Sequence, residues 1–198
     1  MRLAQGWLPW TAVPLLGSLL AALVWWPAAL ALAALTVFVV WFFRDPDRQP
    51  SEGIVAAADG RIQEIDGRAV TFLNLHHVHV VRAPYEGTIE TVERVSGGRL
   101  PAFLKGAEKN GGVAIVADTE WGNRRIDLKA GAIARRAVSF VDEGDHVAKG
   151  ERIGMIRFGS RVDVDLPDPV RREVAPGDRV TAAETTIATP TDTGDASP

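Results

Sequence analysis

The residues best able to do chemistry in this sequence fall into three short groups, of which the first is a Gly-Ser pair. Gly159 and Ser160 lie between two runs of strand-forming residues, in "MIRFGSRVDVDLP". Because glycine has no Cβ, the Gly159 carbonyl is open to attack by the Ser160 hydroxyl. The pair could therefore be a backbone bond that is cut by its own serine. A β-bulge is the structural alternative.

Histidines form the second group. Three of the four histidines in the chain lie in "HHVH", at residues 76–79. On a strand, His77 and His79 would share one face and His76 would take the other. Two histidines at this spacing could ligate a metal, and one of them could act as a general base. Histidines that only pack within a half-buried strand are the alternative.

Asp59, in "AAADGRI", is the third candidate. An Asp-Gly pair between apolar runs is typical of a hairpin turn. A carboxylate can also orient a histidine, as the acid of a Ser-His-Asp set does. The residues alone leave both interpretations open. The chain contains no cysteine, which excludes thiol catalysis, Cys-ligated zinc and disulfides.

The elements that must position these residues are mainly strands. After a polar, proline-rich linker at 44–53, apolar and polar residues alternate in short runs bounded by Gly, Asp and Pro. This pattern predicts a mainly β domain over residues 54–188, a sandwich or partly closed barrel, followed by a disordered tail at 189–198.

An internal repeat lies within that domain. "VDEGDHVAKGERI" begins at Val141 and "VAPGDRVTAAETT" begins at Val174, and Val, Gly-Asp, Val and Glu recur at matching offsets. Each copy is predicted to be a strand, a Gly-Asp turn and another strand. The repeat resembles the hammerhead turns of lipoyl-type β-sandwiches, and it supports an architecture and not a function.

The N-terminal segment has a different composition. From Gly6 to Phe43 there is no ionisable side chain, and "WWP" at 25–27 divides the run. Proline disfavours a continuous helix and tryptophan favours the membrane interface, so the run predicts a transmembrane helical hairpin over residues 1–43. One long kinked helix is the alternative. Arg2 and Arg44 flank the run, which predicts that both ends face the cytoplasm.

Several separated motifs together resemble the short, membrane-anchored phosphatidylserine decarboxylases and their archaetidylserine-using relatives. These motifs are "FFRDPDR", "ADGRI", "HVHVVRAP", "GMIRFGSRVDVDLP" and "GDRV" followed by "AAET". They occur in the order and spacing of that family from about residue 42 to residue 188. The resemblance implies a carbon–carbon lyase that removes carbon dioxide from a serine phospholipid.

The resemblance also implies roles for the candidate residues. Ser160 Oγ attacks the Gly159 carbonyl, and the chain separates there, leaving the former Ser160 as a pyruvoyl group. This self-derived cofactor forms a Schiff base with the substrate amine and accepts the electrons left when carbon dioxide departs. His79 matches the base for self-cleavage, Asp59 its acid partner, and His76 the residue that assists decarboxylation. No metal is implied.

Partners and location follow from the same resemblance. An N-terminal fragment (the β chain, 1–159) and a C-terminal fragment (the α chain, 160–198) are expected to associate as a heterodimer, with any higher oligomer left open. The expected location is the cell membrane, with the catalytic domain on the cytoplasmic face and no nucleic acid bound. Arg82 and Arg161 could meet phosphate or carboxylate. Whether the lipid is built on diacylglycerol or archaeol stays open.

Two other functions remain as alternatives. A zinc peptidoglycan endopeptidase of the lysostaphin type would also combine H-x-H with a glycine-rich repeat. In such enzymes, however, H-x-H follows the repeat, whereas here it precedes it. A membrane-anchored, lipoyl-like adaptor would explain the apolar N-terminus and the repeat. It would give no reason for the clustered histidines or for the Gly-Ser pair.

Overall fold

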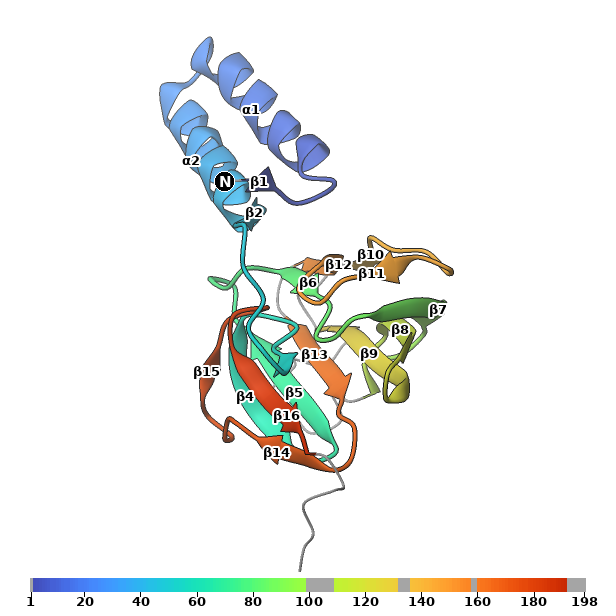
Figure 1. The fold of residues 1–198 in the computed structure, drawn as a ribbon. Helices are drawn as coiled ribbons and strands as arrows, with labels where there is room; N and C mark the ends of the chain where they lie inside the picture. The colour runs from blue at the N-terminus through green and yellow to red at the C-terminus, as the bar shows by residue number, and fades with distance from the viewer. Residues whose placement is uncertain (1, 99–108, 132–135, 158–159, 192–198) are drawn as a thin grey trace, which may run out of the picture. The chain divides into compact units, whose positions relative to one another are not determined.

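The computed structural model describes the whole chain except residues 1, 99–108, 132–135, 158–159 and 192–198. The chain divides into two compact units, Met1–Asp47 and Arg48–Pro198. The first unit is mainly helical, and the second is built of strands (Figure 1).

The first unit contains α1 (Leu8–Ala22) and α2 (Trp26–Phe42), which pack against each other. Two short strands, β1 (Arg2–Leu3) and β2 (Arg44–Asp45), pair antiparallel at the ends of the uncharged run. Pro27 lies in the first turn of α2, where its missing N–H would have had no partner within the helix. The uncharged run therefore forms two helices and not one continuous helix.

The prediction that these helices form a transmembrane hairpin is not supported. In the part of the chain that the structure describes, no helix is both long and apolar enough to cross a membrane. The helix α1 has 15 residues and α2 has 17. A membrane-spanning helix needs about 20 apolar residues, because each residue adds only about 1.5 Å of rise.

The second unit is organised around an eight-stranded sheet in the order β11-β7-β8-β9-β13-β5-β4-β15, in which every pair of neighbours is antiparallel. The sheet is curled (Figure 1). Its strands are β4 (Gly60–Ile65), β5 (Arg68–Leu73), β7 (Gly87–Val95), β8 (Gly112–Thr119), β9 (Gly122–Ala130), β11 (His146–Val147), β13 (Ser160–Asp165) and β15 (Arg179–Val180).

Two three-stranded sheets complete the second unit, in the orders β10-β12-β6 and β14-β16-β3. The prediction of a mainly β domain is therefore confirmed. The strands of these sheets are β3 (Ile54–Val55), β6 (Val80–Arg82), β10 (Arg136–Ser139), β12 (Arg152–Arg157), β14 (Val170–Arg172) and β16 (Thr186–Pro190).

The hydrophobic core follows from the alternation of side chains along the strands. In β13, Val162 and Val164 are at most 1% exposed and belong to the core cluster, together with Ile126 and Leu128 of the neighbouring β9. Burial of each such side chain contributes about 1.5–3 kcal/mol. The intervening residues of β13 are charged and therefore occupy the opposite face of the sheet.

The two copies of the sequence repeat adopt the same turn. The backbone N–H of Asp142 donates to the Asp145 carboxylate, and that of Ala175 donates to the Asp178 carboxylate, both at 2.8 Å. The glycine before each of these aspartates, Gly144 or Gly177, has a positive φ that an L-residue rarely adopts. The two copies place β11 and β15 at opposite ends of the eight-stranded sheet.

Candidate active site

Ser160 is the first residue of β13, which lies between β5 and β9 in the eight-stranded sheet. Its register partners are Leu73 of β5 and Ala130 of β9. The predicted cleavage partner, Gly159, lies outside the described residues, and for Ser160 only the backbone is described. The backbone nevertheless fixes where the predicted cleavage position enters the sheet.

The histidine segment is a turn and not a strand. The strand β6 begins only at Val80, so the interpretation that places His76, His77 and His79 on a strand was wrong. The backbone N–H of His77 donates to the Asn74 carbonyl at 3.0 Å, and the N–H of Asn74 donates to Nδ1 of His77 at 3.0 Å. These local bonds satisfy backbone groups that a strand ladder would otherwise pair.

The turn separates the environments of the two histidines in the H-x-x-H pattern. A flat strand would place His76 and His79 on opposite faces, and the turn likewise does not bring the two side chains into one environment. The side chain of His76 is exposed, whereas His79 is fully buried. The rings of His76 and His77 lie 4.2 Å apart between centroids.

The histidine turn contacts two strands that reach the predicted cleavage position, β5 and β12. Leu73, the register partner of Ser160, is the last residue of β5, and the turn begins at the next residue. At the other end of the turn, the His79 carbonyl accepts a hydrogen bond from the N–H of Ile156 in β12 at 3.1 Å. The strand β12 ends at Arg157, just before the residues that precede Ser160. The fold thus brings the H-x-x-H turn beside the chain on both sides of Gly159–Ser160.

Asp59 immediately precedes β4, and it lies among donors that favour its charged form. Arg48 donates to both carboxylate oxygens, through Nη1 to Oδ1 and through Nη2 to Oδ2 at 2.9 Å. The N–H of Ala182 adds a bond to Oδ1 at 2.9 Å. The backbone N–H of Val78, which immediately precedes His79, also favours the charged carboxylate. Asp59 therefore lies close to the histidine turn.

These contacts determine the charge of Asp59. Burial by itself would raise the pKa of this carboxyl, but the hydrogen bonds from Arg48 and Ala182, the charge of Arg48 and the bond from Val78 outweigh it, so the pKa lies below its usual value. Asp59 is consequently a carboxylate at neutral pH. Arg48 was not predicted as a site residue, although it is the last residue of the "FFRDPDR" motif, which was the available signal for its role.

The two arginines proposed to meet phosphate or carboxylate have partners within the protein. Arg82 is 3% exposed, and its Nη1 donates to the Gly150 carbonyl at 2.9 Å. Arg161 binds the carboxylate of Asp163 through Nε at 2.5 Å and Nη2 at 3.1 Å. The carboxylate that Arg161 meets is thus the protein's own. Among the described residues, no group of three or more His, Cys, Asp or Glu side chains is arranged to hold a metal ion.

Comparison with known proteins gives a family for this arrangement. The family model described as phosphatidylserine decarboxylase matches residues 35–188. The chain belongs to the phosphatidylserine decarboxylase family. It is accordingly a decarboxylase, a carbon–carbon lyase, and the resemblance drawn from the separated motifs is confirmed. The peptidase and adaptor alternatives do not agree with this match.

Individual members of the family resemble the chain over nearly its whole length. A phosphatidylserine decarboxylase proenzyme of Streptomyces coelicolor is 44% identical, over 94% of this chain and 92% of its own. A similar proenzyme of Streptomyces griseus is 41% identical, over 94% and 93%. A protein of Methanococcoides burtonii, provisionally named as an archaetidylserine decarboxylase proenzyme, is 43% identical, over 94% and 95%.

Proposed function

We propose that the protein cuts itself between Gly159 and Ser160 and then decarboxylates a membrane serine phospholipid to the corresponding ethanolamine phospholipid. The observation that carries this proposal is the position of the H-x-x-H turn between β5 and β12, beside the chain that leads into and out of Gly159–Ser160. The proenzyme names of the bacterial relatives agree with self-cleavage.

Cleavage begins with attack of the Ser160 hydroxyl on the Gly159 carbonyl. The acyl group moves from nitrogen to oxygen, and elimination then releases the Gly159 carboxylate. Water hydrolyses the remaining enamine, ammonia leaves, and residue 160 becomes a pyruvoyl group. The first step needs a base because a hydroxyl is a weak nucleophile at neutral pH. His79 is our candidate, since it is fully buried and its carbonyl accepts the N–H of Ile156 in β12, the strand that leads into the cleavage position. Asp59 lies close to the same turn, where the Val78 N–H favours its charged form.

The location of residue 160 fits a cofactor that is made in place. It begins a strand that is paired on both sides, so the group would be held by the backbone and needs no separate binding pocket. A pyruvoyl carbonyl supplies an electron sink for the carboxylate carbon that departs. His76, which is exposed on the turn, can be reached by a substrate and is our candidate for protonating the product.

The two fragments would stay together through the sheets. The C-terminal fragment supplies β13, β15 and β16, which pair with β5 and β9, with β4, and with β3 of the N-terminal fragment. Separating the fragments would break these ladders and expose the core residues of β13. We therefore propose a heterodimer that persists after the cut.

We also propose that the first unit associates with the membrane that holds the substrate. Its helices carry many exposed large apolar side chains, and Leu23, Val24, Trp25 and Trp26 at the connection between them are 64–89% exposed. Exposed apolar patches of this kind mark interaction surfaces, and tryptophan favours the lipid–water interface. The lipid backbone, diacylglycerol or archaeol, is to be decided by assaying both lipids.

The intact mass of the purified protein under denaturing conditions tests this function. We expect two fragments that divide at Gly159/Ser160, the smaller one without a free N-terminal amine. Ser160→Ala and His79→Ala should each remain one chain without activity, whereas His76→Ala should be cut and decarboxylate poorly. An active preparation that consists of a single uncut chain would overturn the proposal.

A further inference from the structure

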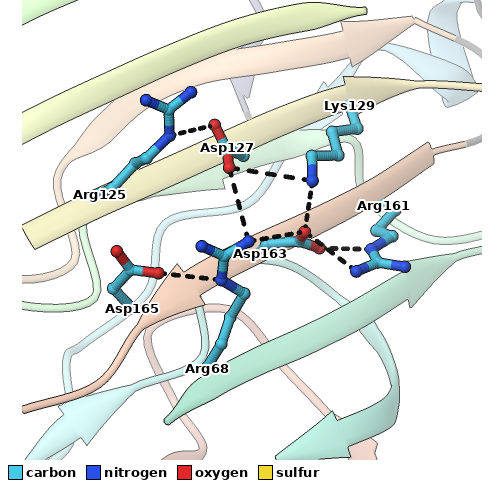
Figure 2. Close-up of polar contacts among 7 residues, drawn as sticks. All are labelled: Arg68, Arg125, Asp127, Lys129, Arg161, Asp163 and Asp165. Carbon is cyan, nitrogen blue, oxygen red and sulfur yellow. Dashed lines mark hydrogen bonds and ion pairs between the residues drawn. The ribbon is translucent and has the colours of Figure 1, made fainter. Parts of the chain in front are cut away.

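Charged side chains gather on the face of the sheet opposite the hydrophobic core, on three adjacent strands, β5, β9 and β13. Figure 2 shows that they point toward one another across these strands. The register places Arg161 opposite Lys129, Asp163 opposite Asp127, and Asp165 opposite Arg68. The residues of this network are Arg68, Arg125, Asp127, Lys129, Arg161, Asp163 and Asp165.

Asp163 is the centre of the network. It is 1% exposed and meets a cation from each of the three strands. Lys129 Nζ of β9 donates to it at 2.7 Å, Arg161 of β13 binds both of its oxygens, and Arg68 Nη1 of β5 lies 3.6 Å away. A carboxylate buried this deeply requires such partners, because an unpaired buried charge is strongly destabilising.

Stability alone does not explain the network. Replacing a buried ion pair by packed apolar side chains is often neutral or stabilising, and the best attested use of such pairs is to fix register. The network extends to the far end of β13, because Arg68 Nε also binds Asp165, the last residue of that strand, at 2.9 Å. Burial by itself would lower the pKa of Arg68, but Asp165, Asp163 and Asp127 raise it overall, so this cation keeps its charge.

The proposed cut would divide this network between two polypeptides. Arg161, Asp163 and Asp165 would belong to the C-terminal fragment, whereas Arg68 and Lys129 would belong to the N-terminal fragment. Cleavage turns residue 160 from the interior of a chain into its first residue. Chain ends fray unless they are tied down, and Asp163 lies only about 10 Å along the strand from that end.

We infer that Asp163, with Lys129 and Arg68, is a positioning residue that holds the newly formed end of β13 in register after cleavage. The inference rests on the proposed self-cleavage. In this role the network acts through the backbone of β13. Its importance is greatest after the cut, because in the uncut chain the preceding peptide bond also restrains residue 160.

The test is the turnover of processed Asp163→Asn, measured per pyruvoyl group counted from the intact mass of the small fragment. We expect processing to continue, kcat per pyruvoyl to fall at least about tenfold, and KM to change little, because small misplacements of a reacting group are costly. Glu173→Gln is the matched control, since Glu173 also lies in the C-terminal fragment and pairs with an arginine, Arg171, but is outside the network. It should keep kcat near that of the wild type.

The outcomes separate the inference from the proposed function. If wild-type protein is cut and active while processed Asp163→Asn has the wild-type kcat per pyruvoyl, the inference is overturned and the proposed function stands. If the wild type is active but uncut, the proposed function itself fails. A variant that only loses yield or stability, with unchanged kcat per pyruvoyl, also overturns the positioning role.

A second variant covers the case in which Asp163→Asn does not accumulate. Lys129→Met removes one of the three cations and leaves Asp163 paired with Arg161 and Arg68. It should lower kcat per pyruvoyl by a smaller factor, with KM unchanged, and a wild-type kcat would overturn the inference. Where both single variants fold, combining them should lower kcat by less than the product of their separate effects, because both break the same contact.

Discussion

The two copies of the internal repeat have the same backbone but different side chains at equivalent positions. Ile62 N–H donates to the Asp178 carbonyl in one copy, as Ile89 N–H does to the Asp145 carbonyl in the other. Val180 is paired with Gly60 in the same way that Val147 is paired with Gly87. The same arrangement of turn and paired strand thus occurs twice within one sheet.

The acidic residues that precede Gly60 and Gly87 lie in different environments. Asp59 precedes Gly60, and its side chain is 15% exposed and bound by Arg48. Glu86 precedes Gly87, is 67% exposed, and has the exposed His146 at 3.3 Å. Only the first lies close to the histidine turn, where the Val78 N–H favours its charged form. The same backbone position therefore becomes part of the candidate site in one copy and a solvated surface in the other.

The largest effect should come from removing the charge of Asp59 and that of Glu86 in separate variants. Asp59→Asn keeps the shape but loses the carboxylate, and we expect self-cleavage to slow by more than about 100-fold, the usual contribution of an acid–base group. Glu86→Gln is the matched control and should process at the wild-type rate. The fraction cut against time, followed by intact mass, measures both. Equal rates for the two variants would remove Asp59 from the candidate site.

A second prediction concerns the pairing that distinguishes Asp59. In Arg48→Met the carboxylate loses its main partner while staying buried, so its pKa should rise, and the free energy of unfolding at neutral pH should fall by about 3 kcal/mol. The lowered pKa of Asp59 in the wild type contributes stability above the unfolded-state pKa, and this contribution is lost as pH falls through the folded-state value. The difference between the two proteins should therefore shrink in acid.

Urea unfolding over a pH series measures this difference. Both proteins should carry Ser160→Ala, so that uncut chains are compared with uncut chains. A difference that is independent of pH down to strongly acidic conditions would show that Arg48 stabilises the fold by packing and not by pairing with Asp59.

The smallest expected effect concerns stability, and it tests whether the two repeat copies have equivalent backbone conformations at one matching position. Gly150 and Ala183 occupy matching places in the copies, and their N–H groups donate to the carbonyls of Ala83 and Ala56 at 2.8 Å. Both have positive φ, 83° and 65°. Ala183→Gly should raise the free energy of unfolding by up to about 1 kcal/mol, since it relieves the left-handed strain of an L-residue.

The reverse change should have the opposite sign. An added Cβ at Gly150 would lie 3.1 Å from Cβ of Pro50, and the left-handed conformation costs an L-residue about 1–2 kcal/mol. Gly150→Ala should therefore lower the free energy of unfolding, as measured by urea titration. If Ala183→Gly and Gly150→Ala changed the free energy of unfolding in the same direction, the two turns would not be equivalent in energy, although they share their hydrogen bonds.

Much of the fold was predictable because it depends on local patterns. Alternation along "SRVDVDLP" predicted a strand with one apolar face, and β13 has that face in the core. The repeated Gly-Asp turns were visible because their carboxylates and glycines are needed by the turn itself. The histidine segment was misjudged because His77 and Asn74 bond to each other, a local alternative that periodicity does not reveal. The short helices of the first unit likewise departed from the predicted membrane-spanning lengths.

The family was predictable from the amino-acid sequence, because separated motifs in a fixed order are specific, and so were the residue types available for chemistry. Their partners became apparent only from the folded arrangement. It joined Arg48 to Asp59, placed the histidine turn between β5 and β12, and gathered three cations around Asp163. The physical reason is that the energy of a buried charge depends on donors brought from distant strands, and no local pattern in the chain specifies which strands become neighbours.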